Sequence, residues 1–252
     1  MQEMNNMKTF YRILMMLVLT VIGTQSINAQ KTYALLAGVS NYGDEQVNLH
    51  NTTKDVKDLK KVLAHQNVVT SVVTSQYANL DNITKKLGAI VKLAKPEDNI
   101  LFFFSGHGDT DGFITSDRAM FRYQKLVEIL RKAKARNVVV FIDACMSGSV
   151  KSISGNNFGI GNAYPKIAFL TASDAEELSI ENNWVGNGYF AQAMQKGLRG
   201  KADRNTDREV TLMELFTYIY NDVTFRTRNY ESVQHPQFVG PESMHSLVLA
   251  RW

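Results

Sequence analysis

VVVFIDACMSG, residues 138–148, is a run of apolar residues that breaks into polar turn residues around a cysteine. The apolar residues at its start are rich in β-branched side chains, which predicts a buried strand. Asp143 ends the run, Cys145 follows, and Ser147 with Gly148 is typical of a turn. The single cysteine of the chain therefore stands just past the end of a predicted strand, in polar surroundings.

A second stretch, LFFFSGHG at residues 101–108, has the same design. Its apolar strand ends at glycines that flank His107. In parallel α/β sheets, ligands bind beyond the carboxyl ends of the strands. If the two strands are neighbours, His107 and Cys145 lie at one edge of the sheet. A thiol and a base are the minimum for nucleophilic catalysis.

The rest of the chain alternates between strand and helix patterns, which indicates a largely parallel sheet covered by helices on both faces. We expect a three-layer α-β-α sandwich with roughly six strands. The predicted strands are 33–39, 68–73, 101–104, 138–142 and 166–171, and the tail at 246–249 is the candidate for the sixth. Apolar spacing predicts helices within 56–63, 83–94, 126–133, 190–198 and 212–223.

Composition and charge narrow the classes of protein. A chain of 252 residues that is 44% hydrophobic can form one substantial core, so we expect one catalytic domain. The net charge of +4 is mild, and the basic residues are scattered along the chain rather than striped, which argues against nucleic-acid binding. One cysteine cannot form an internal disulfide. It is either a small buried hydrophobe or a reactive group, and its position past a strand end favours the second.

The amino terminus resembles a secretory signal peptide. Lys8 and Arg12 precede an apolar run at 13–22, and a polar stretch with a small residue, Ala29, follows. The run is too short for a comfortable membrane span, although an uncleaved anchor is the alternative. We therefore predict a signal peptide at 1–29, a mature domain at 30–252 without a stable membrane span, and a secreted or periplasmic location.

The motifs Ser105–Gly108 (SGHG) and Asp143–Gly148 (DACMSG), together with the region around Asp55, resemble the caspase–metacaspase group of cysteine peptidases, which includes clostripain-like and gingipain-like enzymes. Cys145 stands 38 positions after His107, a shorter gap than the roughly 50 of the caspase signature and more similar to that of bacterial relatives. The resemblance implies a caspase-haemoglobinase-like fold and a Cys-His dyad. Cys145 would attack the scissile carbonyl, His107 would protonate the leaving amine, and the backbone amides of Gly108 and Cys145 would hold the oxyanion.

The resemblance also implies a specificity pocket. Asp55, Asp143 and Ser105 match the positions that line the first-subsite (S1) pocket of metacaspase-like enzymes, and two carboxylates with a hydroxyl suit an Arg or Lys at the P1 position of the substrate. Asp143 stands where caspases have glutamine, which argues against aspartate specificity. As alternatives, Asp143 caps a turn, Asp55 stabilises a helix N-terminus and Ser105 is a turn residue.

Self-processing is a further expectation. Lys151 and Lys166 bracket a stretch rich in Gly, Asn and Ser after the cysteine, which corresponds to the interchain linker of caspases. An enzyme specific for Lys or Arg would be able to cut its own chain at Lys151.

None of the motifs described above needs a metal ion for its expected chemistry. Residues 203–214, DRNTDREVTLME, are similar to an EF-hand calcium loop, but Arg208 stands where that loop needs glycine. Thr211 and Glu214 also form a capping box, which accounts for Glu214 without a metal. We expect no required cofactor, with calcium at this loop as the alternative.

The sequence thus predicts a secreted cysteine endopeptidase that cleaves protein or peptide substrates after Arg or Lys. The main alternative is a catalytically silent caspase-like scaffold that binds peptides or protein partners. An esterase or transferase on a similar sheet is disfavoured because no Gly-x-Ser-x-Gly motif is present.

Overall fold

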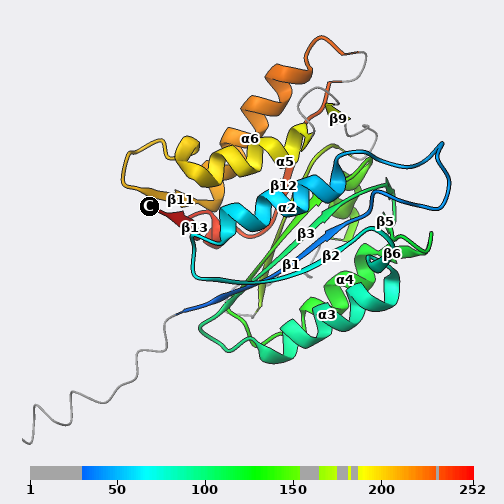
Figure 1. Ribbon diagram of the computed structural model, residues 1–252. Coiled ribbons are helices and arrows are strands. Elements are labelled where there is room, and N and C mark those ends of the chain that lie inside the picture. The colour runs from blue at the N-terminus through cyan, green and yellow to red at the C-terminus, as the bar shows by residue number, and fades with distance from the viewer. Residues whose placement is uncertain (1–29, 154–164, 175–180, 183–186, 231–232) are drawn as a thin grey trace, which may run out of the picture. The chain divides into compact units, whose positions relative to one another are not determined.

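The computed structural model describes residues 30–153, 165–174, 181–182, 187–230 and 233–252 (Figure 1). The predicted signal peptide at 1–29 and most of the Gly/Asn/Ser-rich stretch after Lys151 lie outside the described residues. Residues Lys31–Trp252 form one compact unit. Within these ranges, none of the helices combines the length and the hydrophobicity of a membrane-spanning segment.

A six-stranded sheet forms the centre of this unit, with the strand order β12-β8-β7-β3-β1-β2. Five strands are parallel, and β12 runs antiparallel to β8 at one edge. The prediction of a largely parallel sheet of about six strands is confirmed. The strands are β1 (Thr32–Gly38), β2 (Val68–Thr74), β3 (Asn99–Ser105), β7 (Asn137–Asp143), β8 (Lys166–Thr171) and β12 (Gln237–Val239).

Helices cover both faces of the sheet, so the molecule has the three predicted layers (Figure 1). One face packs against α3 (Leu80–Leu93) and α4 (Tyr123–Leu130). The other packs against α2 (Thr52–Leu63), α5 (Tyr189–Lys196) and α6 (Leu212–Thr227).

Two hydrophobic cores result from this arrangement, because successive side chains of a strand point to opposite faces. In β3, Phe102 packs into the core under α3 and α4, and Phe103 packs into the core under α2, α5 and α6. Each of these phenylalanines is fully buried. This is why the central strands are continuous apolar runs rather than alternating ones.

The sixth strand is not the one that the sequence predicted. The tail strand β13 (Val248–Arg251) pairs with β11 (Glu209–Thr211) in a separate two-stranded sheet, and β12 takes the edge position of the main sheet. A strand of three residues directly after Pro236 has too little apolar pattern to be recognised from sequence.

The remaining elements are short. Between β3 and α4 lies a three-stranded antiparallel sheet of β4 (Gly108–Asp109), β5 (Gly112–Ile114) and β6 (Met120–Arg122). The last pair is β9 (Glu181–Asn182) with β10 (Asn187–Gly188). Short helical turns occur at Ser75–Tyr77, Ser147–Ile153, Gly197–Lys201 and Glu242–Met244.

The N-terminal caps of two helices compare with the sequence as follows. The capping box of Thr211 and Glu214 at the start of α6 is confirmed. At α2 the cap residue is Asn51, whose side chain makes no capping hydrogen bond.

Candidate active site

The carboxyl ends of β1, β3 and β7 form the edge of the sheet where the predicted site residues meet. The parallel register pairs Gly38 with Ser105 and Ser105 with Asp143. The register continues past the strands, because the Gly106 N–H donates to the Asp143 carbonyl at 3.1 Å. His107 and Cys145, each two residues beyond a paired strand end, are therefore brought to the same edge.

A cavity of about 180 Å³ opens at this edge. Its lining contains the thiol, the imidazole, both predicted carboxylates and the predicted serine. The lining residues are Leu49, Thr52, Asp55, Ser105, Gly106, His107, Asp143, Cys145 and Gly188. The structure thus brings together all the predicted dyad and pocket residues, and Gly108, although not part of this lining, packs against the cysteine segment.

The imidazole of His107 is held by the loop between β1 and α2. Its Nε2 lies 2.6 Å from the carbonyl oxygen of Val47. Because a carbonyl only accepts hydrogen bonds, this contact assigns the proton to Nε2 and leaves Nδ1 as the basic nitrogen of a neutral ring. The His107 backbone N–H donates to the Tyr42 hydroxyl at 2.7 Å, and the two rings lie 4.7 Å apart between centroids.

Tyr42 and Val47 were missed by the sequence analysis. Tyr42 is 97% buried and links the loop after β1 to His107, whereas Val47 acts through its backbone carbonyl. A backbone carbonyl leaves no signal in the sequence. The tyrosine would have been found only by knowing that residues 42 and 107 are neighbours.

The Cys145 thiol is half-buried and forms no disulfide, and it lies in a segment with a constrained backbone. The next residue, Met146, has a φ of 53°, in the left-handed region that side chains other than glycine rarely adopt. Gly108 packs so closely that a Cβ there would lie 2.8 Å from the Ala144 Cβ and against the Cys145 carbonyl. A glycine is therefore required at 108, and the backbones of the predicted oxyanion residues are adjacent.

The two predicted pocket carboxylates are almost completely buried. Asp55 is 1% exposed and Asp143 is 6% exposed. Asp55 accepts hydrogen bonds from the Ser105 hydroxyl at 3.1 Å and from the Gly188 N–H at 3.3 Å. Asp143 accepts one from the Ala191 N–H at 3.2 Å. These hydroxyl and backbone N–H donors orient the carboxylate oxygens.

The amino terminus of α5 lies against both carboxylates. A Cβ on Gly188 would lie 2.7 Å from Asp143 Oδ2 and 3.7 Å from Asp55 Oδ2. The positive end of the helix dipole favours negative charge at this position. Gly188 was also missed by the sequence analysis, because nothing near it in the chain indicates that α5 packs over the site.

Lys151, the predicted self-cleavage residue, lies on the turn Ser147–Ile153 that follows the cysteine. Its ammonium pairs with Asp174 at 3.2 Å, and both side chains are half exposed. Lys151 is not part of the cavity lining.

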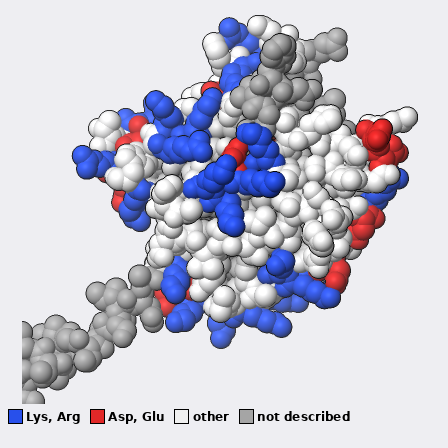
Figure 2. Space-filling view, in the orientation of Figure 1, with Lys and Arg blue, Asp and Glu red and all other residues white. Residues whose placement is uncertain are grey.

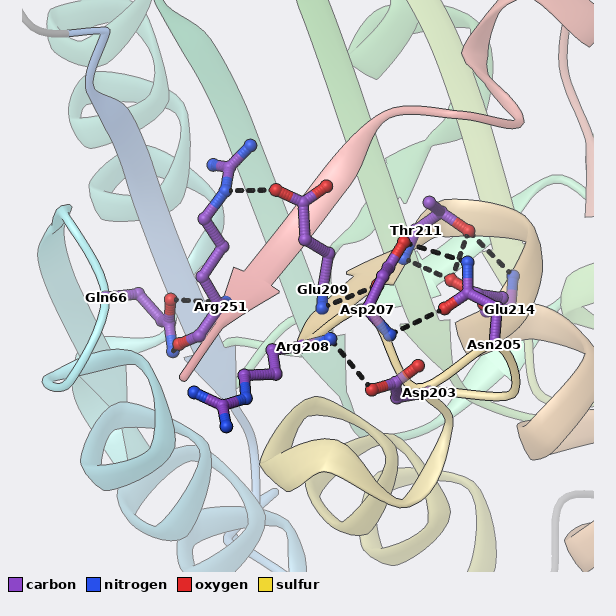
Figure 3. Close-up of polar contacts among 9 residues, drawn as sticks. All are labelled: Gln66, Asp203, Asn205, Asp207, Arg208, Glu209, Thr211, Glu214 and Arg251. Atoms are coloured by element: carbon purple, nitrogen blue, oxygen red, sulfur yellow. Dashed lines mark hydrogen bonds and ion pairs between the residues drawn. The ribbon is translucent and has the colours of Figure 1, made fainter.

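The segment that is similar to a calcium loop uses its oxygens in its own turns (Figure 3). Asp203 accepts hydrogen bonds from two backbone N–H groups of the loop, at 2.7 and 3.1 Å, and Asp207 accepts one from the N–H two residues on, at 2.8 Å. Glu214 closes the capping box with Thr211. In the part of the chain that the structure describes, no group of three His, Cys, Asp or Glu side chains converges as a metal site.

These features define a class of protein: a three-layer α/β domain with a thiol, an imidazole and buried carboxylates in one cavity beyond the parallel strands. The family model of the caspase domain matches residues 31–244. The chain belongs to the caspase domain family and carries a caspase-like peptidase domain, which implies protein substrates.

Solved structures share the fold at low sequence identity. Caspase-1 from Spodoptera frugiperda aligns with a TM-score of 0.66 and 15% identity, over 90% of this chain and 93% of that one. The protein GSU0716 from Geobacter sulfurreducens aligns with a TM-score of 0.63 and 16% identity, over 86% of this chain and 97% of that one. No curated protein matches the sequence. The structural likeness supports the caspase-like fold.

Proposed function

We propose that the chain is a secreted cysteine endopeptidase that uses Cys145 and His107 to cleave peptide bonds after Arg or Lys. The observation that supports this most is the single cavity that both side chains share with Asp55 and Asp143. A nucleophile, a base and a negatively charged pocket are the parts that such a reaction needs.

The proposed reaction gives each of these groups one role. His107 takes the thiol proton, and the Cys145 sulfur attacks the scissile carbonyl carbon. The backbone amides of Gly108 and Cys145 then stabilise the oxyanion, a contribution of about 10²–10³ in rate per donor in other enzymes. His107 donates its proton to the leaving amine, and a water molecule activated by the same imidazole hydrolyses the thioester and restores the thiol.

The Val47 carbonyl contributes to both proton transfers. It keeps the proton of the neutral ring on Nε2, and it stabilises the imidazolium that forms when His107 takes the thiol proton. The imidazole thereby keeps one orientation while its charge changes.

The proposed P1 specificity rests on the two buried carboxylates. Asp55 and Asp143 lie in the cavity and are held by a hydroxyl and by backbone N–H groups, so their oxygens are fixed before a substrate arrives. A guanidinium or ammonium of the substrate would neutralise this charge, and a guanidinium is able to bind two oxygens at once. An aspartate at P1 would add a third carboxylate to a poorly solvated site, which costs several kcal/mol.

Peptides that differ only at P1 test this proposal. We expect wild-type protein to cleave fluorogenic peptides with Arg or Lys at P1 and to leave the Asp counterpart uncut, and the Cys145→Ala variant to cleave none. Equal rates on Arg and Asp peptides would refute the pocket assignment. Full activity of Cys145→Ala would refute the dyad, and an inactive wild-type protein would favour the silent scaffold.

Self-cleavage and secretion have separate tests. Intact mass spectrometry of incubated wild-type and Cys145→Ala protein should show a cut after Lys151 in the wild type only. Identical masses would refute self-processing.

Protein exported from cells should begin at Gln30. Exported protein that still carries residues 1–29 would contradict the predicted signal peptide.

A further inference from the structure

A second cavity, of about 460 Å³, lies at the other end of α2. Its lining includes Lys61, His65, Gln66, Arg199, Arg251 and Trp252. The helix begins at Thr52, which lines the candidate active site, and ends at Leu63, next to this cavity. With a rise of about 1.5 Å per residue, the helix separates the two sites by roughly 15 Å.

The floor of this cavity is apolar. Val62 and Leu198 are 5% and 3% exposed, and both belong to the core under α2 and α5. Cavities of this size with an apolar floor and a few polar groups are typical of sites for small organic ligands.

The indole of Trp252 packs against Gly200, beside the apolar floor of the cavity. A Cβ on Gly200 would lie 3.0 Å from the indole Cζ2 and 3.1 Å from Cε2, so the ring rests directly on the glycine backbone. Gly200 also has a φ of 103°, which other residues rarely adopt. The residue as a whole is still 51% exposed, so Trp252 is accessible to a ligand.

Arg251 is held in place through its backbone and its Nε (Figure 3). The Gln66 side chain accepts from the Arg251 N–H and donates to its carbonyl, both at 3.0 Å, and Arg251 Nε pairs with Glu209 at 2.7 Å. A guanidinium has five N–H groups, so those of the two terminal nitrogens remain for a ligand.

Three cationic side chains line the cavity, Lys61, Arg199 and Arg251, and two of them are paired with acids, Lys61 with Asp58 and Arg251 with Glu209. Lys61 shares the carboxylate of Asp58 with Lys54, at 2.9 and 2.6 Å. Partial burial opposes ionisation of Asp58, but the hydrogen bonds and charges of both lysines outweigh it and lower its pKa. Arg199 has no acidic partner among the described residues.

The surrounding surface has the same sign. Figure 2 shows Lys and Arg side chains gathered over α2 and over the neighbouring end of the molecule that carries β11 and β13, with few acidic side chains between them. An anion approaching this face would be attracted toward the cavity.

We propose that this cavity binds a small organic anion, with its phosphate or carboxylate group on Arg199, Arg251 and Lys61 and its flat apolar part on the indole of Trp252. Guanidinium groups bind both kinds of anion in two-point contacts, and an aromatic ring favours a planar partner. The site does not depend on the proposed peptidase activity, since none of its residues lines the candidate active site.

Tryptophan fluorescence tests this proposal directly, because the chain has two tryptophans and Trp184→Phe leaves Trp252 as the only one. The probes are phenyl phosphate, benzoate and inorganic phosphate, with benzyl alcohol as the neutral control. We expect a saturable change of Trp252 emission with one or both aromatic anions, and weaker binding of inorganic phosphate and benzyl alcohol. Tighter binding of phenyl phosphate would identify a phosphate ester as the ligand class, and tighter binding of benzoate a carboxylate.

Charge variants separate a built site from general attraction. Arg199→Gln and Arg251→Gln should each weaken binding by about tenfold, the effect of removing one charge-assisted hydrogen bond. Lys57→Gln, which removes an exposed charge of α2 outside the cavity, should leave the affinity unchanged within about twofold. Circular dichroism confirms that each variant is folded, and Lys61→Gln replaces any that is not.

Three results would overturn the proposal. They are the absence of saturation at millimolar anion, equal binding of benzyl alcohol, and an equal loss from Lys57→Gln. The last result would show that the face attracts anions without a specific site.

Discussion

The two cavities at the ends of α2 differ in the sign of their charge and in how that charge is held. At the start of the helix, Asp55 and Asp143 are buried, and fixed N–H and O–H donors set their positions. At its end, Lys61 and Arg251 are exposed side chains, and each is paired with an acidic side chain at the surface. The helix dipole favours this distribution, with acid in the first turn and base in the last.

This comparison shows that the sign of the charge alone does not determine how selectively a cavity binds its ligand. A buried carboxylate with its oxygens already oriented can select one cation geometry, because little reorganisation remains when a ligand binds. Exposed cations on long stems bind anions of several shapes with less discrimination. We therefore expect sharp specificity at the acidic cavity and broad specificity at the basic one.

Removing the nucleophile or the base should have the largest effect. Cys145→Ala and His107→Ala should each lower kcat/KM on Arg peptides by about 10⁴-fold or more, since covalent attack and proton transfer depend on these groups. The measurement is steady-state kinetics, with circular dichroism as the control for folding. A loss of less than tenfold in either variant would mean that another residue performs that step.

Changing the acidic pocket should affect substrate binding next. Asp143→Asn should raise KM for Arg peptides by about thirtyfold or more, because loss of one partner of a buried charge pair costs roughly 2–5 kcal/mol. Asp98→Asn is the matched control, since Asp98 is a buried carboxylate that accepts backbone N–H groups far from the cavity. It should lower the melting temperature and leave KM unchanged. If KM rises equally in both variants, the effect of Asp143→Asn comes from general destabilisation and not from the pocket.

A smaller effect is expected from the tyrosine that positions His107. Tyr42→Phe keeps the ring but removes the acceptor for the His107 N–H, a loss of about 1 kcal/mol, or roughly fivefold. We expect kcat to fall by that factor with KM almost unchanged, as determined from full saturation curves. A rise in KM with constant kcat would place Tyr42 in substrate binding instead.

The smallest effect on activity should come from the end of the molecule that carries the basic cavity. Thr211→Ala removes the capping box of α6 and should lower stability by about 1 kcal/mol, measured by urea unfolding. Peptidase kinetics should stay unchanged, because Thr211 lies outside both cavity linings. Loss of activity in the folded variant would show that the two ends of the molecule are coupled.

The sequence predicted which residues gather at the carboxyl edge of the sheet, for a physical reason. The apolar runs before Ser105 and Asp143 are long, buried on both faces and followed by polar turns, so the ends of β3 and β7 are marked in the chain. Strands β3 and β7 pair in parallel, with Ser105 opposite Asp143. His107 and Cys145 each lie two residues further on, so they reach the same edge of the sheet.

Contacts between distant segments were not predictable in this way. The Val47 carbonyl carries no side-chain signal, and Gly188 reaches the carboxylates only through the packing of α5. Lys61, Arg199 and Arg251 are far apart in the chain and looked scattered, although the fold places them in one cavity. Local patterns mark elements, but only tertiary packing shows which charges meet.

The central claim is that a thiol and an imidazole act beside a carboxylate pocket that selects a cationic residue. Cleavage-site profiling on an unbiased peptide library, read by mass spectrometry against a Cys145→Ala blank, tests it most directly. We predict that nearly all cuts follow Arg or Lys and that Asp143→Asn weakens this preference. Cuts after Asp, or cuts without regard to charge, would contradict it.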